Sequence, residues 1–73
     1  MNFDSFYKKL GLKIKSFREK AGLTQELLAE KSNLSLDYIG KIEVSINKPG
    51  LKALLKISNA LNIEMKDLFD FNK

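Results

Sequence analysis

Residues 24–44 read TQELLAEKSNLSLDYIGKIEV and carry two short helix signals separated by three residues. Thr24 is a favourable N-cap, because its hydroxyl can accept a hydrogen bond from the first turn of a helix. Leu23 and Leu28 have the spacing of a hydrophobic staple, which fixes the direction in which a chain enters a helix. The first signal therefore predicts a helix that ends at about Ser32.

The second helix signal begins at Ser35, which is another favourable N-cap. Leu34 and Ile39 repeat the staple spacing, so the pattern predicts a helix over residues 35–44. Asn33 tolerates the left-handed backbone conformation that a tight turn requires. A three-residue connection between two short capped helices forces them to cross sharply, as in a helix-turn-helix.

The segment before this motif has helical periodicity. Apolar residues recur every three or four positions from Phe3 to Ala21, and Gly22 then ends the pattern as a C′ residue would. Gly11 lies inside the pattern, where glycine costs roughly 1 kcal/mol relative to alanine. The segment is therefore either one helix or a short N-terminal turn that leads into a helix from about Leu10.

The segment after the motif predicts two more helices. Residues 45–50 form a loop, in which Pro49 prevents the preceding helix from continuing. Apolar spacing over residues 51–61 predicts a fourth helix with Asn62 as its C-cap. A short fifth helix follows within residues 62–73. We expect an all-α fold, a compact five-helix bundle, built as a single domain with an N-terminal extension at residues 1–9.

The composition narrows the classes of function. The chain has 73 residues, and no apolar run approaches the roughly 20 residues that span a bilayer. Its first residues lack the apolar region of a signal peptide, so we expect a cytoplasmic protein. The sequence contains no Cys and no His, which removes the commonest zinc ligands and nucleophilic or general-base catalysis by these residues. We expect no enzyme activity, metal, cofactor or small-molecule ligand.

The charge favours an anionic partner. The net charge is +4 and the isoelectric point is about 9.4, and lysines crowd the first twenty residues. A basic balance is typical of proteins that bind nucleic acid or an acidic membrane surface.

Residues at fixed spacings in all five predicted helices form a recognisable set: Gly11-x-x-Ile14, Arg18-Glu19, Gly22-Leu23-Thr24-Gln25, Leu28-Ala29-Glu30-Lys31, Leu34-Ser35, Tyr38-Ile39, Ile42-Glu43, Pro49, Leu54-Leu55-Lys56-Ile57, Ala60-Leu61 and Leu68-Phe69. With this set, the sequence from Leu10 to Phe69 resembles the Cro/repressor-type, or XRE-like, helix-turn-helix family. The resemblance implies the lambda-repressor-like DNA-binding fold and a sequence-specific transcriptional regulator that binds double-stranded DNA. It implies that residues 35–44 enter the major groove, and that a homodimer binds an inverted repeat with its two recognition helices roughly 34 Å apart.

The resemblance also implies roles for individual residues. Gln25 would clamp a backbone phosphate and brace the recognition helix. Lys41 is the strongest candidate for base reading, because lysine donates well to guanine O6 and N7, and Asp37 could accept from cytosine N4. Lys48 is a candidate for a phosphate contact. The full set of DNA-binding candidates is Gln25, Ser35, Leu36, Asp37, Tyr38, Lys41 and Lys48.

Structural alternatives stay open for several of these residues. Lys41 and Lys48 could be ordinary solvated lysines, and Asp37 suits the positive end of a helix dipole. Tyr38 could belong partly to the core. Leu36 on an exposed face would suit a protein-protein interaction module that uses a helix-turn-helix fold. A membrane-surface binder that uses the basic, aromatic N-terminus is a third alternative.

Two further features of the family pattern concern geometry. Arg18 and Glu43 match a pair that links the first helix to the recognition helix, so we expect a structural role for them. Ser45 stands where family members commonly have glycine, which predicts a strained or altered turn after the recognition helix.

The C-terminal segment is the expected dimer surface, although its apolar residues could instead close a small core. The resemblance leaves open whether the chain is like a phage Cro-type regulator, a restriction-modification controller protein or an antitoxin-type repressor. The candidate dimer residues are Ile63, Met65, Leu68, Phe69 and Phe71.

Overall fold

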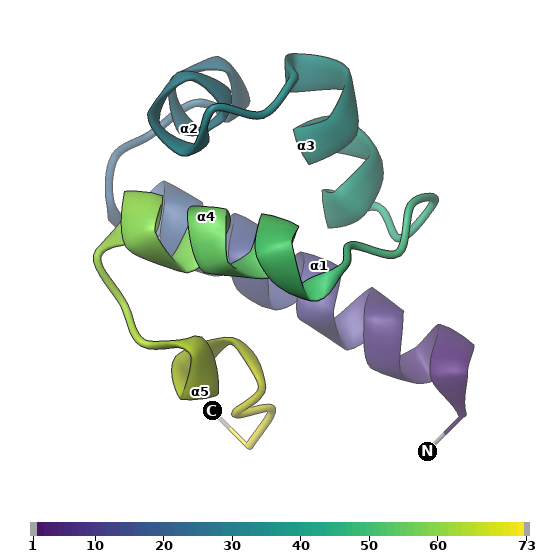
Figure 1. Cartoon of the computed structure of the whole chain (residues 1–73). Helices are drawn as coiled ribbons and strands as arrows, with labels where there is room; N and C mark the ends of the chain where they lie inside the picture. Colours follow the sequence, from purple (N-terminus) through teal and green to yellow (C-terminus); the bar gives the residue numbers. More distant parts are fainter. Residues whose placement is uncertain (1, 73) are drawn as a thin grey trace.

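The computed structural model describes residues 2–72, and this part of the chain is helical, without a strand. α2 and α3 lie together above α1 and α4, which cross the middle of the molecule, and α5 lies below them (Figure 1). The prediction of an all-α fold with five helices is confirmed. In chain order the helices are α1 (Phe3–Lys20), α2 (Gln25–Ser32), α3 (Leu36–Glu43), α4 (Leu51–Leu61) and α5 (Met65–Leu68).

One apolar core joins all five helices. Each helix contributes at least one side chain that is buried in this core. Because a domain of this size buries a modest apolar area, each of these side chains matters for stability. The buried apolar residues are Leu10, Ile14, Leu28, Ala29, Ile39, Ile42, Leu54, Ile57, Leu61 and Leu68.

The caps predicted for α2 and α3 are present. The Leu27 backbone N–H donates to Thr24 Oγ1 at 3.1 Å, and the Tyr38 N–H donates to Ser35 Oγ at 3.0 Å. Asn33 ends α2 in the left-handed conformation, with φ of 57°. Helices of eight residues are marginal in water, so a cap that contributes about 1 kcal/mol helps to define where each one begins.

α1 is one continuous helix of 18 residues. The chain therefore does not begin with a separate turn before Leu10, which was the alternative that Gly11 left open. Asn2 caps α1, since its side-chain oxygen accepts a hydrogen bond from the Ser5 N–H at 2.7 Å. Phe6 also holds the first turns of α1 in place. Its ring stacks on that of Phe69, with 6.0 Å between the ring centroids, and meets the Phe71 ring edge to face, with 5.5 Å between the centroids. The N-terminal extension is therefore mainly the start of α1.

Gly11 allows α1 and the end of α3 to approach closely. A Cβ atom at this position would lie 2.5 Å from the Ile42 carbonyl oxygen and 2.7 Å from the Glu43 carbonyl oxygen. Such distances are far shorter than any normal van der Waals contact. The expectation that Gly11 costs stability is therefore wrong, because helix packing at this site outweighs intrinsic helix propensity.

The turn after α3 is strained, as predicted from the presence of Ser45 where family members commonly have glycine. Ser45 adopts φ of 61°, a left-handed conformation that costs a residue other than glycine about 1–2 kcal/mol. The Ser45 N–H donates to the Ile42 carbonyl, and the Ile46 N–H donates to the Lys41 carbonyl at 2.8 Å. These hydrogen bonds close the end of α3 and keep Ser45 in its strained conformation.

The C-terminal segment corrects one prediction about the dimer surface. Leu68 is fully buried within its own chain, so its inclusion in that surface is wrong. Ile63, Met65 and Phe71 are partly buried against the same core, whereas Phe69 is more than one-third exposed. The apolar end of the chain therefore mainly completes the core. Among the described helices, none has both the length and the apolar character needed to cross a bilayer.

We predict opposite effects for alanine at two glycines within helices. Gly11→Ala should destabilise the protein by about 1–3 kcal/mol, because the new methyl group would force α1 away from α3. Gly40→Ala is the matched control, since its Cβ would make only an ordinary contact of 3.5 Å with Gln25 Oε1. It should be neutral or stabilise the helix by up to about 1 kcal/mol. Urea unfolding measures both changes, and equal effects would contradict this account of Gly11.

Candidate functional site

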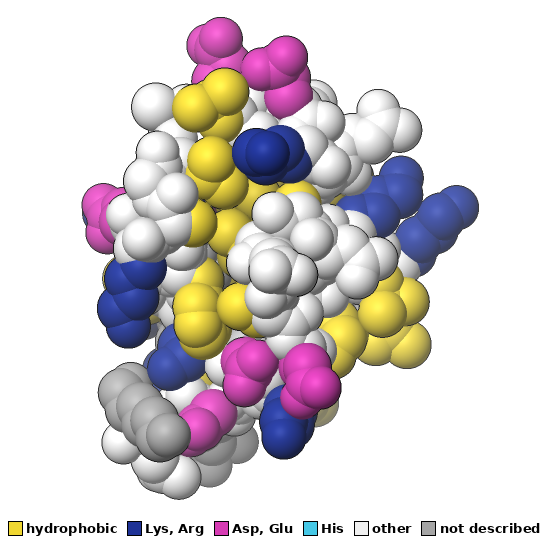
Figure 2. Space-filling view, turned by 90° about the vertical axis from the view of Figure 1, so that its left-hand side faces the viewer, with side chains coloured by type: hydrophobic (Ala, Val, Ile, Leu, Met, Phe, Trp, Pro, Cys, Tyr) yellow, Lys and Arg dark blue, Asp and Glu magenta, His cyan; other side chains and the backbone are white. Residues whose placement is uncertain are grey.

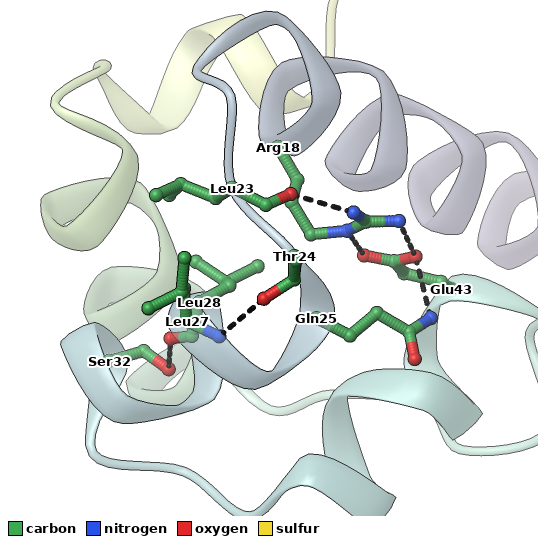
Figure 3. A network of polar contacts seen from close by, with 8 residues as sticks. All are labelled: Arg18, Leu23, Thr24, Gln25, Leu27, Leu28, Ser32 and Glu43. Atoms are coloured by element: carbon green, nitrogen blue, oxygen red, sulfur yellow. Dashed lines mark hydrogen bonds and ion pairs between the residues drawn. The ribbon is translucent and has the colours of Figure 1, made fainter.

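A buried ion pair joins α1 to the end of α3. The Arg18 guanidinium donates through Nε to Glu43 Oε2 at 2.7 Å and through Nη2 to Glu43 Oε1 at 3.1 Å (Figure 3). The Arg18 side chain is 10% exposed and the Glu43 side chain is 1% exposed. Two parallel hydrogen bonds between planar groups restrict both distance and angle. This contact therefore fixes the orientation of α3 against α1.

Two further groups complete the network around this pair. Gln25, the first residue of α2, donates through Nε2 to Glu43 Oε1 at 3.0 Å. Arg18 Nη1 donates to the Leu23 carbonyl oxygen at 2.8 Å. Figure 3 shows that these side chains converge from α1, α2 and α3 on one point. Because three helices share one carboxylate, α3 is held relative to both α1 and α2.

The sequence pattern pointed to Arg18, Gln25 and Glu43 as members of this network, but not to Leu23. Leu23 takes part through its backbone carbonyl, for which a side-chain pattern carries no signal. The left-handed Gly22, with φ of 74°, and the Schellman-type turn that follows α1 place this carbonyl beside Arg18.

The Arg18 guanidinium keeps its positive charge. The hydrogen bond with Glu43 raises the pKa of the Arg18 guanidinium above its ordinary value, and this effect outweighs burial, which lowers it. Arg18 therefore stays protonated throughout the physiological range. Desolvation of two charges offsets much of their attraction, so such a pair contributes more to geometry than to net stability.

The outer face of α3 is exposed, in contrast to its buried inner face. Ile39 and Ile42 face the core, while the Asp37 side chain is 75% exposed and the Leu36 residue is 47% exposed. Ser35, the N-cap, is also exposed. α3 thus presents its N-terminal turn and one side to solvent. A helix N-terminus carries a partial positive charge, which favours a nearby anion.

Tyr38 lies between these two faces. It is partly buried and packs against the core, which agrees with the alternative that gives its ring a structural role. Within residues 2–72, His, Cys, Asp and Glu form no group of three that could hold a metal ion.

Both lysines selected as DNA contacts have carboxylate partners. Lys41 Nζ lies 3.0 Å from Asp37 Oδ2, one turn away on α3. Lys48 Nζ lies 3.6 Å from Asp4 Oδ1 and 5.7 Å from the centre of the Tyr7 ring. Exposed ion pairs contribute only about 0–1 kcal/mol, so either lysine can exchange its partner for another acceptor.

Five of the nine acidic residues belong to the α2 and α5 segments. Figure 2 shows the left-hand side of Figure 1, where Asp and Glu side chains collect at the top, over α2, and at the bottom, over α5. These two segments are therefore poor surfaces for a polyanion. The acidic residues of the α2 and α5 segments are Glu26, Glu30, Glu64, Asp67 and Asp70.

We predict that the buried pair is costly to break from one side only. Arg18→Met should destabilise the protein by about 3–5 kcal/mol, because it leaves Glu43 buried without its main partner. The double variant Arg18→Met/Glu43→Leu should lose clearly less stability than Arg18→Met alone, since no unpaired charge remains buried. Urea unfolding of both variants, with Glu43→Leu as the third corner of the cycle, measures the coupling. Additive losses would contradict the proposed pairing energy.

Comparisons with known proteins identify the family. The helix-turn-helix family profile matches residues 14–68. The immunity repressor protein of Bacillus phage phi105 is 41% identical over 56 residues, which cover 77% of this chain but only 39% of the repressor. The control protein C.BamHI of Bacillus amyloliquefaciens is 39% identical over 62 residues, covering 84% of this chain and 76% of the control protein.

The structural comparison agrees with the sequence comparison. The restriction-modification controller protein C.AhdI from Aeromonas hydrophila superposes with a TM-score of 0.88 at 35% identity, covering 89% of this chain and 98% of C.AhdI. The resemblance seen in the sequence is thereby confirmed. The chain belongs to the helix-turn-helix family of DNA-binding transcriptional regulators.

Proposed function

We propose that this chain is a sequence-specific, cytoplasmic regulator of transcription that acts as a single domain, without catalysing a reaction. It binds double-stranded DNA with residues 35–44 in the major groove. The observation that carries this proposal is the network around Glu43, which holds α3 rigidly against α1 and α2 while the outer face of α3 stays exposed. A helix held in this way can enter a groove without losing its orientation.

The N-terminal end of α3 is the part that would reach the bases. Ser35 and Leu36 lie in its exposed first turn, where the positive end of the helix dipole also favours a phosphate. Leu36 would meet a thymine methyl group. Tyr38 is more buried and would contribute at the edge of the groove.

Lys41 and Asp37 would act as one unit. Their ion pair lies on the exposed face of α3, so Lys41 can donate to guanine while Asp37 accepts from cytosine on the opposite strand. Because the pair is neutral as a whole, it would add little to affinity for DNA of any sequence. We therefore assign it mainly to sequence discrimination.

Gln25 would connect the network to the DNA backbone. A side-chain amide nitrogen carries two hydrogens, and only one of them is needed for the bond to Glu43 Oε1. The second hydrogen can donate to a phosphate oxygen next to the start of α2. Lys48 would contact a phosphate on the other side of α3 by exchanging Asp4 for it.

We infer that the chain binds as a homodimer on an inverted repeat, because one recognition helix covers few base pairs. Phe69 is the exposed member of the surface predicted from residues 62–73. α4, which packs against α5, adds Leu51 and Leu55, two exposed apolar side chains one helical turn apart. An exposed apolar group of this kind favours association with a second copy of the chain.

The second candidate function is a protein-protein interaction module on the same fold. The exposed Leu36 and the neutral Asp37–Lys41 pair favour it, because both suit a protein surface better than a phosphate backbone.

Selection from a pool of random duplexes tests the main proposal. The regulator should recover an inverted repeat with half-sites centred about one helical turn apart. Recovery of featureless sequences, together with no measurable binding of random duplex, would favour the interaction module.

We predict different effects for the two members of the α3 ion pair. Lys41→Ala should relax the preference at one or two positions of each half-site and cost about 1–3 kcal/mol of discrimination there. Asp37→Asn should release the charge of Lys41, raise affinity for random duplex and steepen the salt dependence by about one unit. Fluorescence anisotropy with the selected and random duplexes measures both effects. An unchanged base preference in Lys41→Ala would remove it from base reading.

We predict that the exposed face of α4 is needed for dimer formation. Leu55→Glu should place a charge in the contact between the two copies and shift the protein to monomer. Leu27→Glu is the control, because Leu27 is a similarly exposed leucine, 42% against 47%, on α2. Sedimentation equilibrium measures the change. A dimer that persists in Leu55→Glu, or a wild-type protein that is monomeric with and without DNA, would refute this surface.

A further inference from the structure

Two lysines of α1 lie on one stripe of the helix, apart from the residues considered so far. Lys8, Leu12 and Lys15 are spaced four and three residues apart, so they share a face of α1. All three are exposed. Seven residues of helix separate the two lysines by about 10.5 Å along the axis. Their charges therefore form a short basic line rather than a single point.

This stripe borders the network that holds α3. Lys8, Leu12 and Lys15 line one groove together with Gln25, Glu43 and Val44, and the volume of the groove is about 280 Å³. The groove therefore brings α1 beside the first residue of α2 and the end of α3. Gly11 makes this arrangement accessible, because it lets the end of α3 lie directly against α1.

The groove has an uncompensated positive charge. Glu43 is the acidic residue that lines it, and its carboxylate is neutralised by Arg18. Within residues 2–72, neither Lys8 nor Lys15 forms an ion pair. Lys41 and Lys48, in contrast, both have aspartate partners. The stripe on α1 thus offers an anion two charges that need not first leave another partner.

We propose that Lys8 and Lys15 bind the phosphate backbone of the same duplex that α3 reads, beside the phosphate assigned to Gln25. This inference rests on the proposed function and extends its DNA contact to α1. The occupant of the groove is a DNA strand, because the charge is positive and the groove continues directly from Gln25 and α3. Lys8 lies outside the family match at residues 14–68, whereas Lys15 lies within it.

The other basic face of α1 supplies a matched control. Lys9 and Lys20 are also exposed, but they line a different groove, which includes Phe71 and no residue of α2 or α3. Lys8→Gln/Lys15→Gln and Lys9→Gln/Lys20→Gln remove the same two charges from the same helix. A contact with DNA should distinguish these double variants, whereas a long-range effect of net charge should not.

The experiment measures binding of the full chain to a random duplex and to its selected duplex by anisotropy, from 50 to 200 mM salt. Lys8→Gln/Lys15→Gln should lower the slope of log affinity against log salt by about 1.8, which corresponds to about tenfold less loss of affinity over this range. Lys9→Gln/Lys20→Gln should keep nearly the wild-type slope. Lys8→Arg/Lys15→Arg should also keep it, because the two charges remain. Thermal unfolding checks that all variants fold.

The outcomes separate this inference from the proposed function. A wild-type protein that binds a specific duplex, with equal slopes in the two glutamine variants, would overturn the α1 contact and leave the proposed function intact. A slope that stays at the wild-type value in Lys8→Gln/Lys15→Gln would do the same. No wild-type binding to either duplex would overturn the proposed function and, with it, this contact. A loss confined to Lys8→Gln/Lys15→Gln and absent from the arginine variant supports the contact.

Discussion

The buried carboxylate of Glu43 is the group on which the geometry of the molecule depends. It accepts hydrogen bonds from Arg18 on α1 and from Gln25 on α2, while its own backbone ends α3. Burying a charge is unfavourable unless its partners are in place, so the pair can form only when all three helices have their correct relative positions. The ion pair thus specifies orientation, and the apolar core provides the stability.

Gly11 and Ser45 show how the backbone adapts to this constraint. Gly11 has no Cβ, and for this reason the last carbonyls of α3 can lie against α1. Ser45 adopts a left-handed conformation, which redirects the chain as it leaves α3. In both places a local preference is overridden by the need to keep Glu43 beside Arg18. Gly11, Ser45 and the ion pair therefore act together to position the end of α3 against α1.

The surface follows a related logic. The lysines of α3 and of the loop after it are each paired with an aspartate, whereas the α1 stripe has no such partner among residues 2–72. Neutral pairs discriminate through hydrogen-bond geometry, and unpaired lysines attract any phosphate. α3 would thus discriminate between base pairs, and the lysines of α1 would attract the phosphate backbone. The division would let base preference change through substitutions on α3 without much change in general affinity.

Local patterns were sufficient to predict much of this protein. Thr24, Ser35, Asn33 and Gly22 act through hydrogen bonds and backbone angles within a few residues, so their roles could be read from neighbouring letters. Arg18 and Glu43 were found through the family resemblance, because no local pattern joins residues that lie 25 positions apart. The cap and staple signals of residues 24–44 predicted where α2 and α3 begin.

Packing between distant segments settled the remaining features. The role of Gly11, the burial of Leu68, the contact of Lys48 with Asp4 and the groove beside Gln25 all depend on which surfaces meet in three dimensions. Helix propensity alone predicts that glycine at position 11 is less stable than alanine, but the α3 carbonyls that lie against it leave no room for a side chain. Periodicity marks Leu68 as apolar without saying which apolar surface it meets. The chain thus encodes its helices through short-range hydrogen bonding, whereas burial and charge pairing between distant segments arise only when the helices assemble.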